Sequence, residues 1–268
     1  MKDNRRQFGF SLTETLLAVG TLAVGLLFIG GTFMTGVYFS SVATERTIAA
    51  SVADEAFAKL QLYRLEPDAS GLSTTQFVPF ERIKAIPASE YLYPSTGESS
   101  SGQYSWTAIC RRAGTNSRLI QVTVFVCRSS GTDAKYWVRK TGAATGFDTS
   151  ALPRPVRVTI ASDAASPTTG EVTIVDPNAA DGVDERAFIN DGAFIVDDAT
   201  GRIYRVLERL AAQPDRIRLA LTRPDPEKSL TPPGSSVWVV PPPASGGRGP
   251  VIAVYQKVLR FNRAGGPL

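Results

Sequence analysis

The carboxylate of Glu14 is the one charged group inside a long apolar segment of the chain. The next charged residue is Glu45, so residues 15–44 carry no formal charge. About 20 apolar residues are enough for a helix to cross the hydrocarbon core of a membrane. A carboxylate at the centre of such a helix costs roughly 2.5–3.5 kcal/mol, less toward the ends, and by default it has a function and a charged partner. Glu14 is therefore the first candidate functional residue.

The composition excludes several other kinds of chemistry. The 268 residues contain no His, the commonest general base near neutral pH and a common metal ligand. Catalytic triads that use His are excluded. We expect a protein that is not an enzyme and that holds no cofactor and no metal at a catalytic site.

The charge does not favour nucleic acid as the main partner. The formal net charge is +4, and four residues ahead of the apolar segment together contribute +2 of it: Lys2, Asp3, Arg5 and Arg6. The remaining +2 is spread over the rest of the chain, whereas nucleic-acid-binding surfaces concentrate basic side chains. With 43% hydrophobic residues, the chain can bury the cores of about two small domains.

The basic residues ahead of the apolar segment predict its orientation. By the positive-inside rule, the N-terminus is cytoplasmic and everything after about residue 40 lies outside. One alternative is a cleaved secretory signal, for which 41–43 (Ser-Val-Ala) offers a cleavage site, but such signals have an apolar core of only about 7–15 residues. Another is an uncleaved membrane anchor. Neither alternative explains Glu14.

The residues around Glu14 carry a family resemblance. Gly9 followed by Phe10-Ser-Leu-Thr-Glu14 resembles the processing signature of type IV pilins and of the pseudopilins of type II secretion. The resemblance implies that a prepilin peptidase cuts between Gly9 and Phe10 and methylates the new N-terminal Phe. It also implies that Glu14, the fifth residue of the mature chain, pairs with the N-terminal amine of a neighbouring subunit. Such pairing makes each charge tolerable in a helix bundle and sets the axial register.

The same resemblance implies a localisation and partners. The precursor would be a single-pass protein of the bacterial inner membrane, and the mature chain would join a periplasmic or surface filament with other pilin or pseudopilin subunits. Many major pilins carry a helix-kinking proline where this chain has Gly30-Gly31, which favours a minor pilin or minor pseudopilin. Pilus and secretion machinery, and tip and shaft positions, stay open. The competing hypothesis is a membrane-anchored extracytoplasmic β-domain protein for ligand or surface binding, such as an adhesin or a DNA-uptake tip subunit.

Beyond the apolar segment the helix is predicted to continue as an amphipathic one. Apolar residues recur at spacings of three and four: Ala49, Val52, Ala53, Ala56, Phe57 and Leu60. Charged residues are expected on the other side: Glu45, Asp54, Glu55 and Lys59. We expect a leader over 1–9 and one helix over 10–64, with its membrane part at about 10–40 and Pro67 just beyond its end.

The rest of the chain predicts an α+β fold, with this helix packed on an antiparallel β-sheet head over 65–140. Strands are expected at 104–110 and 119–127, with a third at 136–139. A linker rich in Gly, Ala, Thr and Pro follows at 141–155, and then a C-terminal all-β domain, a sandwich or barrel, over 156–268. Its expected strands are 156–160, 171–175, 193–196, 202–207, 216–221, 237–240 and 251–255.

Cys110 and Cys127 leave the question of a disulfide open. An oxidising compartment favours one. If Arg112 faces Leu119 across the turn, however, the two cysteines are separated by about six residues, or ~20 Å, along the strand pair. Either the two strands are not neighbours or the thiols are free.

An acidic segment, Asp176 to Glu185, has the density of oxygen ligands found in calcium loops. Some major pseudopilins bind calcium in the head, so the resemblance raises this question too. The spacing departs from the EF-hand pattern, which favours an acidic turn over a calcium site.

Overall fold

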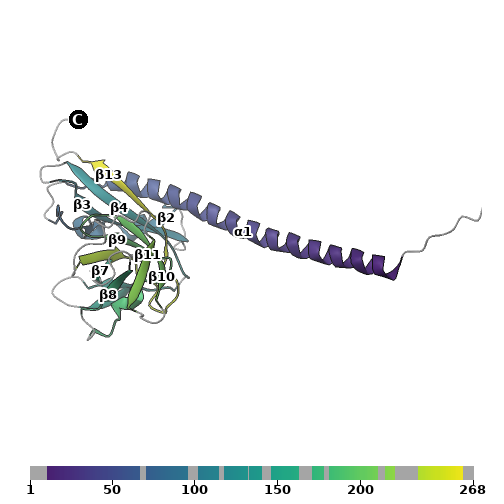
Figure 1. The fold of residues 1–268 in the computed structure, drawn as a ribbon. Coiled ribbons are helices and arrows are strands. Elements are labelled where there is room, and N and C mark those ends of the chain that lie inside the picture. The colour runs from purple at the N-terminus through teal and green to yellow at the C-terminus, as the bar shows by residue number, and fades with distance from the viewer. Residues whose placement is uncertain are drawn as a thin grey trace, which may run out of the picture. The chain divides into compact units, whose positions relative to one another are not determined.

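The computed structural model describes residues 11–66, 71–95, 102–114, 118–131, 133–140, 146–162, 171–177, 181–210, 215–220 and 235–261. The chain forms two compact units, Met1–Thr47 and Ile48–Leu268, and each is described by itself. The first holds the apolar part of a long helix. The second holds the rest of that helix, two antiparallel sheets and a closed β-barrel (Figure 1).

The long helix, α1 (Leu12–Leu62), extends over 51 residues, which corresponds to about 77 Å at 1.5 Å per residue. The helix predicted over 10–64 agrees with these bounds to within two residues at each end. The N–H of Tyr63 still donates to the Lys59 carbonyl at 2.9 Å, but Arg64 has a left-handed backbone with φ of 46°. The helix therefore ends at this point, because a left-handed residue cannot continue it.

The last part of α1 packs through small side chains. Its buried residues are Ala49, Val52, Ala53, Ala56, Phe57, Lys59 and Leu60. The prediction for the apolar face is confirmed, whereas the expectation that Lys59 lies on the solvent side is wrong. Its ammonium group pairs with Glu55 at 2.9 Å and with Glu90 at 3.1 Å, so a buried cation is compensated on both sides.

The helix packs on the head sheet, five antiparallel strands ordered β1–β3–β4–β13, with β2 also paired to β3. The strands are β1 (Val78–Pro79), β2 (Leu92–Tyr93), β3 (Tyr104–Arg112), β4 (Leu119–Arg128) and β13 (Val251–Arg260). Two short helices, α2 (Phe80–Ile83) and η1 (Ala88–Tyr91), lie in the connection between α1 and β3.

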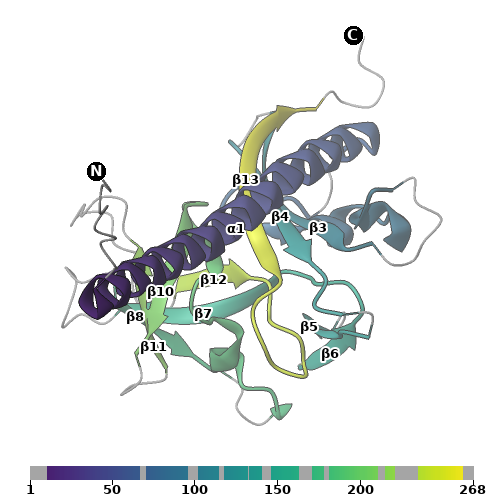
Figure 2. The same cartoon turned by 90° about the vertical axis from the view of Figure 1, so that its right-hand side faces the viewer.

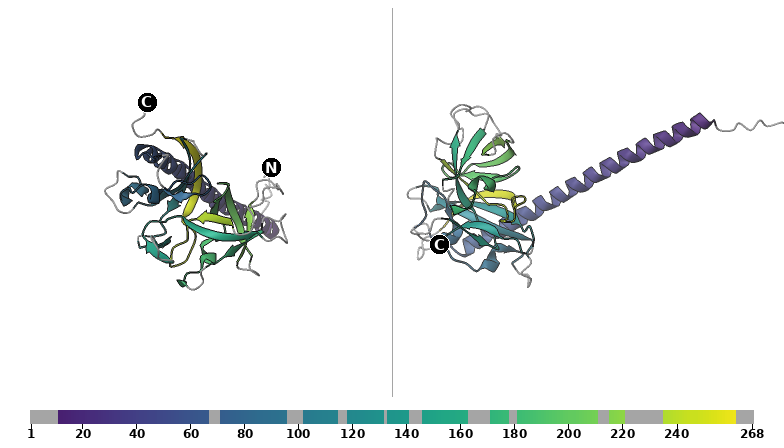
Figure 3. Two further views of the ribbon diagram at one scale, coloured as in Figure 1. Left: turned by 90° about the vertical axis from the view of Figure 1, so that its left-hand side faces the viewer. Right: turned by 90° about the horizontal axis from the view of Figure 1, so that it is seen from below.

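The two faces of the head sheet have different neighbours, because successive side chains of a strand point to opposite faces. One face packs against α1 in a cluster that includes Ala53, Ala56, Leu60, Trp106, Ala108, Cys110, Val122 and Val124. The other face packs against the barrel in a cluster of Phe77, Ile109, Phe125, Cys127, Val196, Trp238 and Val240. Figure 3 (right) shows the barrel strands, in green, on one side of this sheet. Burial of both faces explains why β3 and β4 read as nearly continuous apolar runs.

The second β module is a closed barrel of six strands in the order β10–β11–β8–β7–β12–β9. The strands are β7 (Val156–Ser162), β8 (Glu171–Val175), β9 (Phe194–Asp197), β10 (Ile203–Arg209), β11 (Arg216–Ala220) and β12 (Ser235–Val239), and the short helix η3 (Glu185–Phe188) precedes β9. Its interior is aliphatic and includes Val158, Ile160, Ile174, Ile195, Ile217 and Val237. A barrel, rather than a sandwich, thus follows the head, within the predicted α+β class.

The last strand corrects the predicted domain organisation. The sequence analysis placed 251–255 in the C-terminal all-β domain, but β13 pairs with β4 over its whole length, from Val251 opposite Cys127 to Arg260 opposite Leu119 (Figure 2). The barrel is therefore inserted between two neighbouring strands of the head sheet. A strand pattern shows that a segment is extended and half-buried, but it does not identify the partner strand.

The third strand predicted for the head is also corrected. The strand β5 (Tyr136–Arg139) pairs with β6 (Phe147–Ser150) in a separate two-stranded sheet. The predicted linker at 141–155 thus contains a strand. Its later part is fixed to the head as well, since Arg154 pairs with Glu81 and lies 4.4 Å from the centre of the Tyr91 ring.

The cysteines do not form a disulfide; both are free and fully buried. The predicted strand register was wrong by one residue, because Arg112 faces Ile120 rather than Leu119. Cys110 lies on the face toward α1 and Cys127 on the face toward the barrel, so the sheet separates the two sulfurs. Burial raises the pKa of both thiols far above the ordinary value, and they behave as inert core residues.

Candidate functional site in the apolar part of α1

The apolar side chains of α1 before Thr47 lie outside any core of the described chain. Exposed fractions include 72% for Phe28, 78% for Met34 and 66% for Tyr38. Leaving a large apolar side chain in water forgoes about 1.5–3 kcal/mol. Of the described residues, α1 forms the one helix that is long and apolar enough to cross a membrane, with a mean hydropathy of 2.1 in its most apolar window. This exposed apolar surface is consistent with anchoring in a membrane.

Five threonine hydroxyl groups in this segment form hydrogen bonds within the helix. The hydroxyl groups of Thr15, Thr21 and Thr32 each donate to the carbonyl three residues earlier at 2.9 Å. Those of Thr35 and Thr44 donate to the carbonyl four residues earlier at 2.9 Å. Such bonds allow hydroxyl side chains in an apolar environment without an unpaired donor. The threonines therefore do not argue against a membrane position.

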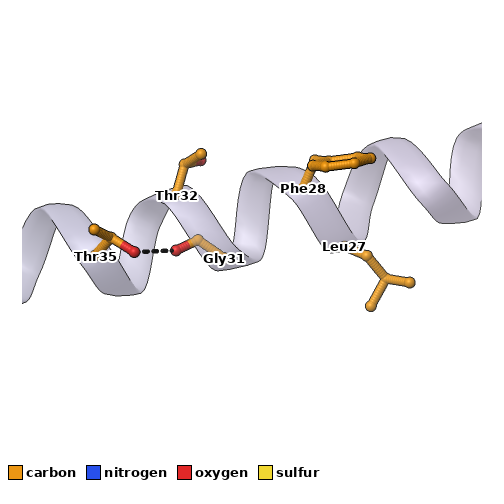
Figure 4. Close-up of a pocket in the computed structure, with 5 residues that line it drawn as sticks. All are labelled: Leu27, Phe28, Gly31, Thr32 and Thr35. Carbon is orange, nitrogen blue, oxygen red and sulfur yellow. Dashed lines mark hydrogen bonds between the residues drawn. The ribbon is translucent and has the colours of Figure 1, made fainter.

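A shallow hollow lies on this helix where Gly31 leaves the surface open (Figure 4). Leu27, Phe28, Gly31, Thr32 and Thr35 line it, and Thr35 bonds to the Gly31 carbonyl across its floor. Apart from the neighbouring residues and the backbone of its own helix, no atom of the described residues lies within 4 Å of a Cβ built at Gly31. Glycine in a helix costs roughly 1 kcal/mol of stability relative to alanine. Packing within the described chain does not offset this cost at Gly31.

Small residues continue from this hollow along one ridge of the helix. They recur every four residues: Thr32, Gly36, Ser40 and Thr44. This spacing lets the backbones of two membrane helices approach closely and is typical of helix pairs in bilayers. The sequence analysis used Gly30-Gly31 only as a departure from the helix-kinking proline of major pilins, and α1 continues through both residues. The four-residue spacing of small residues was the signal for this ridge, and it was missed.

Glu14 lies in the first turn of α1 with an exposed side chain. Within the described residues, no hydrogen bond or ion pair involves its carboxylate, and its N–H donates to the Ser11 carbonyl at 2.9 Å. The positive end of the helix dipole stabilises an anion here by about 0.3–1 kcal/mol, less than burial of the charge in lipid costs. A cationic partner must therefore come from outside this stretch. Gly9 and Phe10 lie outside the described residues.

The acidic segment between β8 and β9 shows local roles for its described members. Asp184 caps η3 through the N–H of Arg186 at 3.0 Å, and Asp181 accepts from the N–H of Val183 at 2.9 Å. The fully buried Glu185 pairs with Arg139 at 2.7 Å. In the described part of the chain no group of three or more Cys, Asp and Glu side chains is arranged to hold a metal. Residues 178–180 lie outside that part.

Comparisons with family models, with curated proteins and with solved structures find no match to this chain. Two features of α1 bear on function: the Glu14 carboxylate, which has no partner among the described residues, and the change in the surroundings of the helix after Thr47.

Proposed function

We propose that this chain is a subunit of a type IV pilin-like filament, a minor pilin or a minor pseudopilin. It is made as a single-pass precursor in the bacterial inner membrane, with its N-terminus in the cytoplasm. Prepilin peptidase cuts it between Gly9 and Phe10 and methylates the new N-terminus. The mature chain then assembles through α1 and carries its β modules outside, in the periplasm or at the cell surface. The chain is the substrate of these two reactions and is not an enzyme.

One observation carries this proposal: a single helix joins an exposed apolar segment to an amphipathic segment that packs on an antiparallel sheet. A plain membrane anchor needs only the first of these. In a filament subunit the same helix contributes both the membrane segment and part of the core of the head. This continuity is expected of a subunit that polymerises through its helix.

The role of Glu14 follows from the same picture. Cleavage before Phe10 creates an α-amino group, which supplies the cation that the described residues lack. In the low dielectric of a helix bundle, a carboxylate and an ammonium group are each tolerated only as a pair. When each Glu14 meets the amine of a neighbouring subunit, the subunits have one favoured axial register. The ridge of small residues from Thr32 to Thr44 then allows the helices to approach closely.

Substitution of Glu14 tests this role. In cells that contain the peptidase, we expect Glu14→Gln to lower the fraction of the protein in pelleted filaments by about tenfold or more, since a loss of ~1.4 kcal/mol changes an equilibrium tenfold. The matched control is Glu45→Gln, which removes a carboxylate of the same helix just after the charge-free segment. The control should assemble normally, and both variants should reach the membrane in equal amounts.

Equal incorporation of the two variants would contradict the proposal and would favour the membrane-anchored β-domain protein. In that case the chain stays in the membrane as separate copies, whatever residue stands at position 14.

A further inference from the structure

The turn between β9 and β10 joins the barrel to the head sheet. Asp198 in this turn is 4% exposed, and its Oδ1 accepts from the N–H of Phe77 at 2.8 Å and from Nε1 of Trp238 at 2.7 Å. Its Oδ2 pairs with Arg157 at 3.0 Å. Phe77 immediately precedes β1 of the head sheet, whereas Trp238 and Arg157 belong to barrel strands. One buried carboxylate thus holds both modules.

Side chains on strands of the head sheet also form hydrogen bonds with the same turn. Arg111, on β3, donates to the carbonyls of Ala199 and Thr200, the latter at 2.8 Å. Its Nε donates to Oε1 of Gln121 at 2.8 Å, which orients the guanidinium group. On β13, Nε2 of Gln256 donates to the Gly201 carbonyl at 2.9 Å. Side chains from three neighbouring strands of the sheet therefore contribute to binding one turn of the barrel.

Gly201 lies at this contact, where a larger residue would be strained and would force side chains of the head to shift. Its φ is +74°, in the region that favours glycine. A Cβ at this position would lie 2.7 Å from Nε2 of Gln121, 3.0 Å from Cζ of Phe77 and 3.1 Å from a terminal nitrogen of Arg111. The close approach of the turn to the sheet depends on the missing side chain.

The turn contacts the head sheet far from the two chain segments that connect the barrel to the head. The barrel is inserted between the end of β4 and the start of β13, where Val251 faces Cys127 and the N–H of Arg128 donates to the Pro250 carbonyl at 2.8 Å. Both connections therefore leave the sheet at one place. Gln121 lies six residues earlier on β4, about 20 Å away at ~3.3 Å per residue. Contacts this far from the connections oppose rotation of the barrel about them.

We propose that residues 197–201 form a latch that holds the inserted barrel in one orientation on the face of the head sheet opposite α1. The barrel is then a rigid part of the head, and its outer surface is presented in a fixed direction, rather than a module that swings on two connections. The apolar layer between the modules fixes their distance, and the latch fixes the rotation, because hydrogen bonds and ion pairs are directional whereas apolar contact is not. This inference is independent of the filament proposal.

The test is the width of a distance distribution between two spin labels on the full chain in detergent. Leu62→Cys in α1 and Leu207→Cys in β10 place the labels on side chains that are 76% and 55% exposed, while Cys110 and Cys127 are fully buried and stay unlabelled. We expect a single narrow distribution with the latch intact. Asp198→Ala and Arg111→Gln should each broaden it about twofold or more.

Two matched controls separate the latch from a general loss of charge pairs. Asp184→Ala removes a cap and an ion pair inside the barrel, and Arg218→Gln removes the pairs with Glu171 and Glu208. Within the described residues, no hydrogen bond or ion pair joins either residue to the head sheet, so both controls should keep the narrow distribution. Should Asp198→Ala fail to fold, Arg111→Gln decides the question, because Arg111 is only partly buried. An unchanged width in the latch variants, or a broad distribution with the latch intact, would overturn the proposal.

Discussion

The two parts of α1 share one backbone geometry and differ in what surrounds them. From Leu12 to Thr47 the apolar side chains project all round the helix and most are exposed, whereas between Ala49 and Leu60 one face of the helix is buried against the head sheet. The first part has apolar side chains on all sides, which packing against a single sheet cannot bury. The second has small alanines on one face and charged groups around the rest. The difference shows that helix propensity determines the backbone, while the distribution of apolar residues around the axis determines which neighbour the helix needs.

Truncation of Leu60 tests this comparison most severely. Leu60 is completely buried under the sheet, and Leu62, two residues on, is 76% exposed. We expect Leu60→Ala to lower the free energy of unfolding of the head by about 2–5 kcal/mol, because it leaves a cavity, and Leu62→Ala to change it by less than about 0.5 kcal/mol. Denaturant unfolding followed by tryptophan fluorescence measures both. Equal effects of the two substitutions would mean that the last turns of α1 do not pack as described.

Enlargement of an alanine sharpens the comparison at a smaller scale. Ala56 is fully buried and Ala58 is exposed, on the same two turns of α1. We expect Ala56→Leu to destabilise the head by about 1–3 kcal/mol through overpacking against the sheet. Ala58→Leu should be within about 0.5 kcal/mol of the unsubstituted protein by the same measurement. If both variants unfold at the same denaturant concentration, the smooth alanine face has no packing role.

Carboxylates extend the comparison, since Glu14 lacks a partner among the described residues while the buried Glu185 has one in Arg139. Burial raises the pKa of Glu185 above its ordinary value of 4.5; Arg139 lowers it by less, and Asp176 and Asp181 raise it further. The folded state therefore holds this proton more tightly than the unfolded state. The stability that the protonated Glu185 carboxyl contributes is complete below about pH 4.5 and is lost as the pH rises through the raised pKa.

Glu185→Gln removes this titration. We expect its free energy of unfolding, relative to that of the unsubstituted protein, to increase as the pH rises from about 4 to about 7. Asp184→Asn is the control of opposite sign, because the hydrogen bond from Arg186 lowers the pKa of Asp184 below 3.8. Its relative stability should decrease as the pH rises toward about 4. A pH-independent difference for Glu185→Gln would show that the carboxylate is not buried as described.

Local patterns in the sequence were sufficient for the elements and insufficient for their partners. The bounds of α1 follow from its unbroken helical pattern and from Pro67 in the sequence just beyond it. The strand β8 was predicted with the bounds that it has, Glu171–Val175. Side-chain period reports exposure along one element and is therefore readable from that element alone. The pairing of β13 with β4 spans an insertion from Arg128 to Val251, and nothing within either strand encodes it. The one-residue error in the register of β3 and β4 arose similarly, from a turn whose geometry was assumed.

The candidate site divides in the same way. Glu14 stands out in the sequence because a lone charge in an apolar segment is costly wherever the chain folds. The latch does not stand out. Residues 197–201 have the Asp and Gly content of an ordinary turn, but the role of Asp198 depends on Phe77 and Arg111, which are remote in sequence. Contacts of this kind become visible only once the modules are placed together.

The most direct test of the filament proposal is the intact mass and the N-terminal residue of the protein extracted from membranes of cells with and without prepilin peptidase. The proposal predicts a chain that begins at N-methylated Phe10 when the peptidase is present and at Met1 when it is absent. A chain that begins at Met1 in both cells would contradict it and leave a membrane anchor. One that begins near Thr44 would contradict it in favour of a secreted β protein.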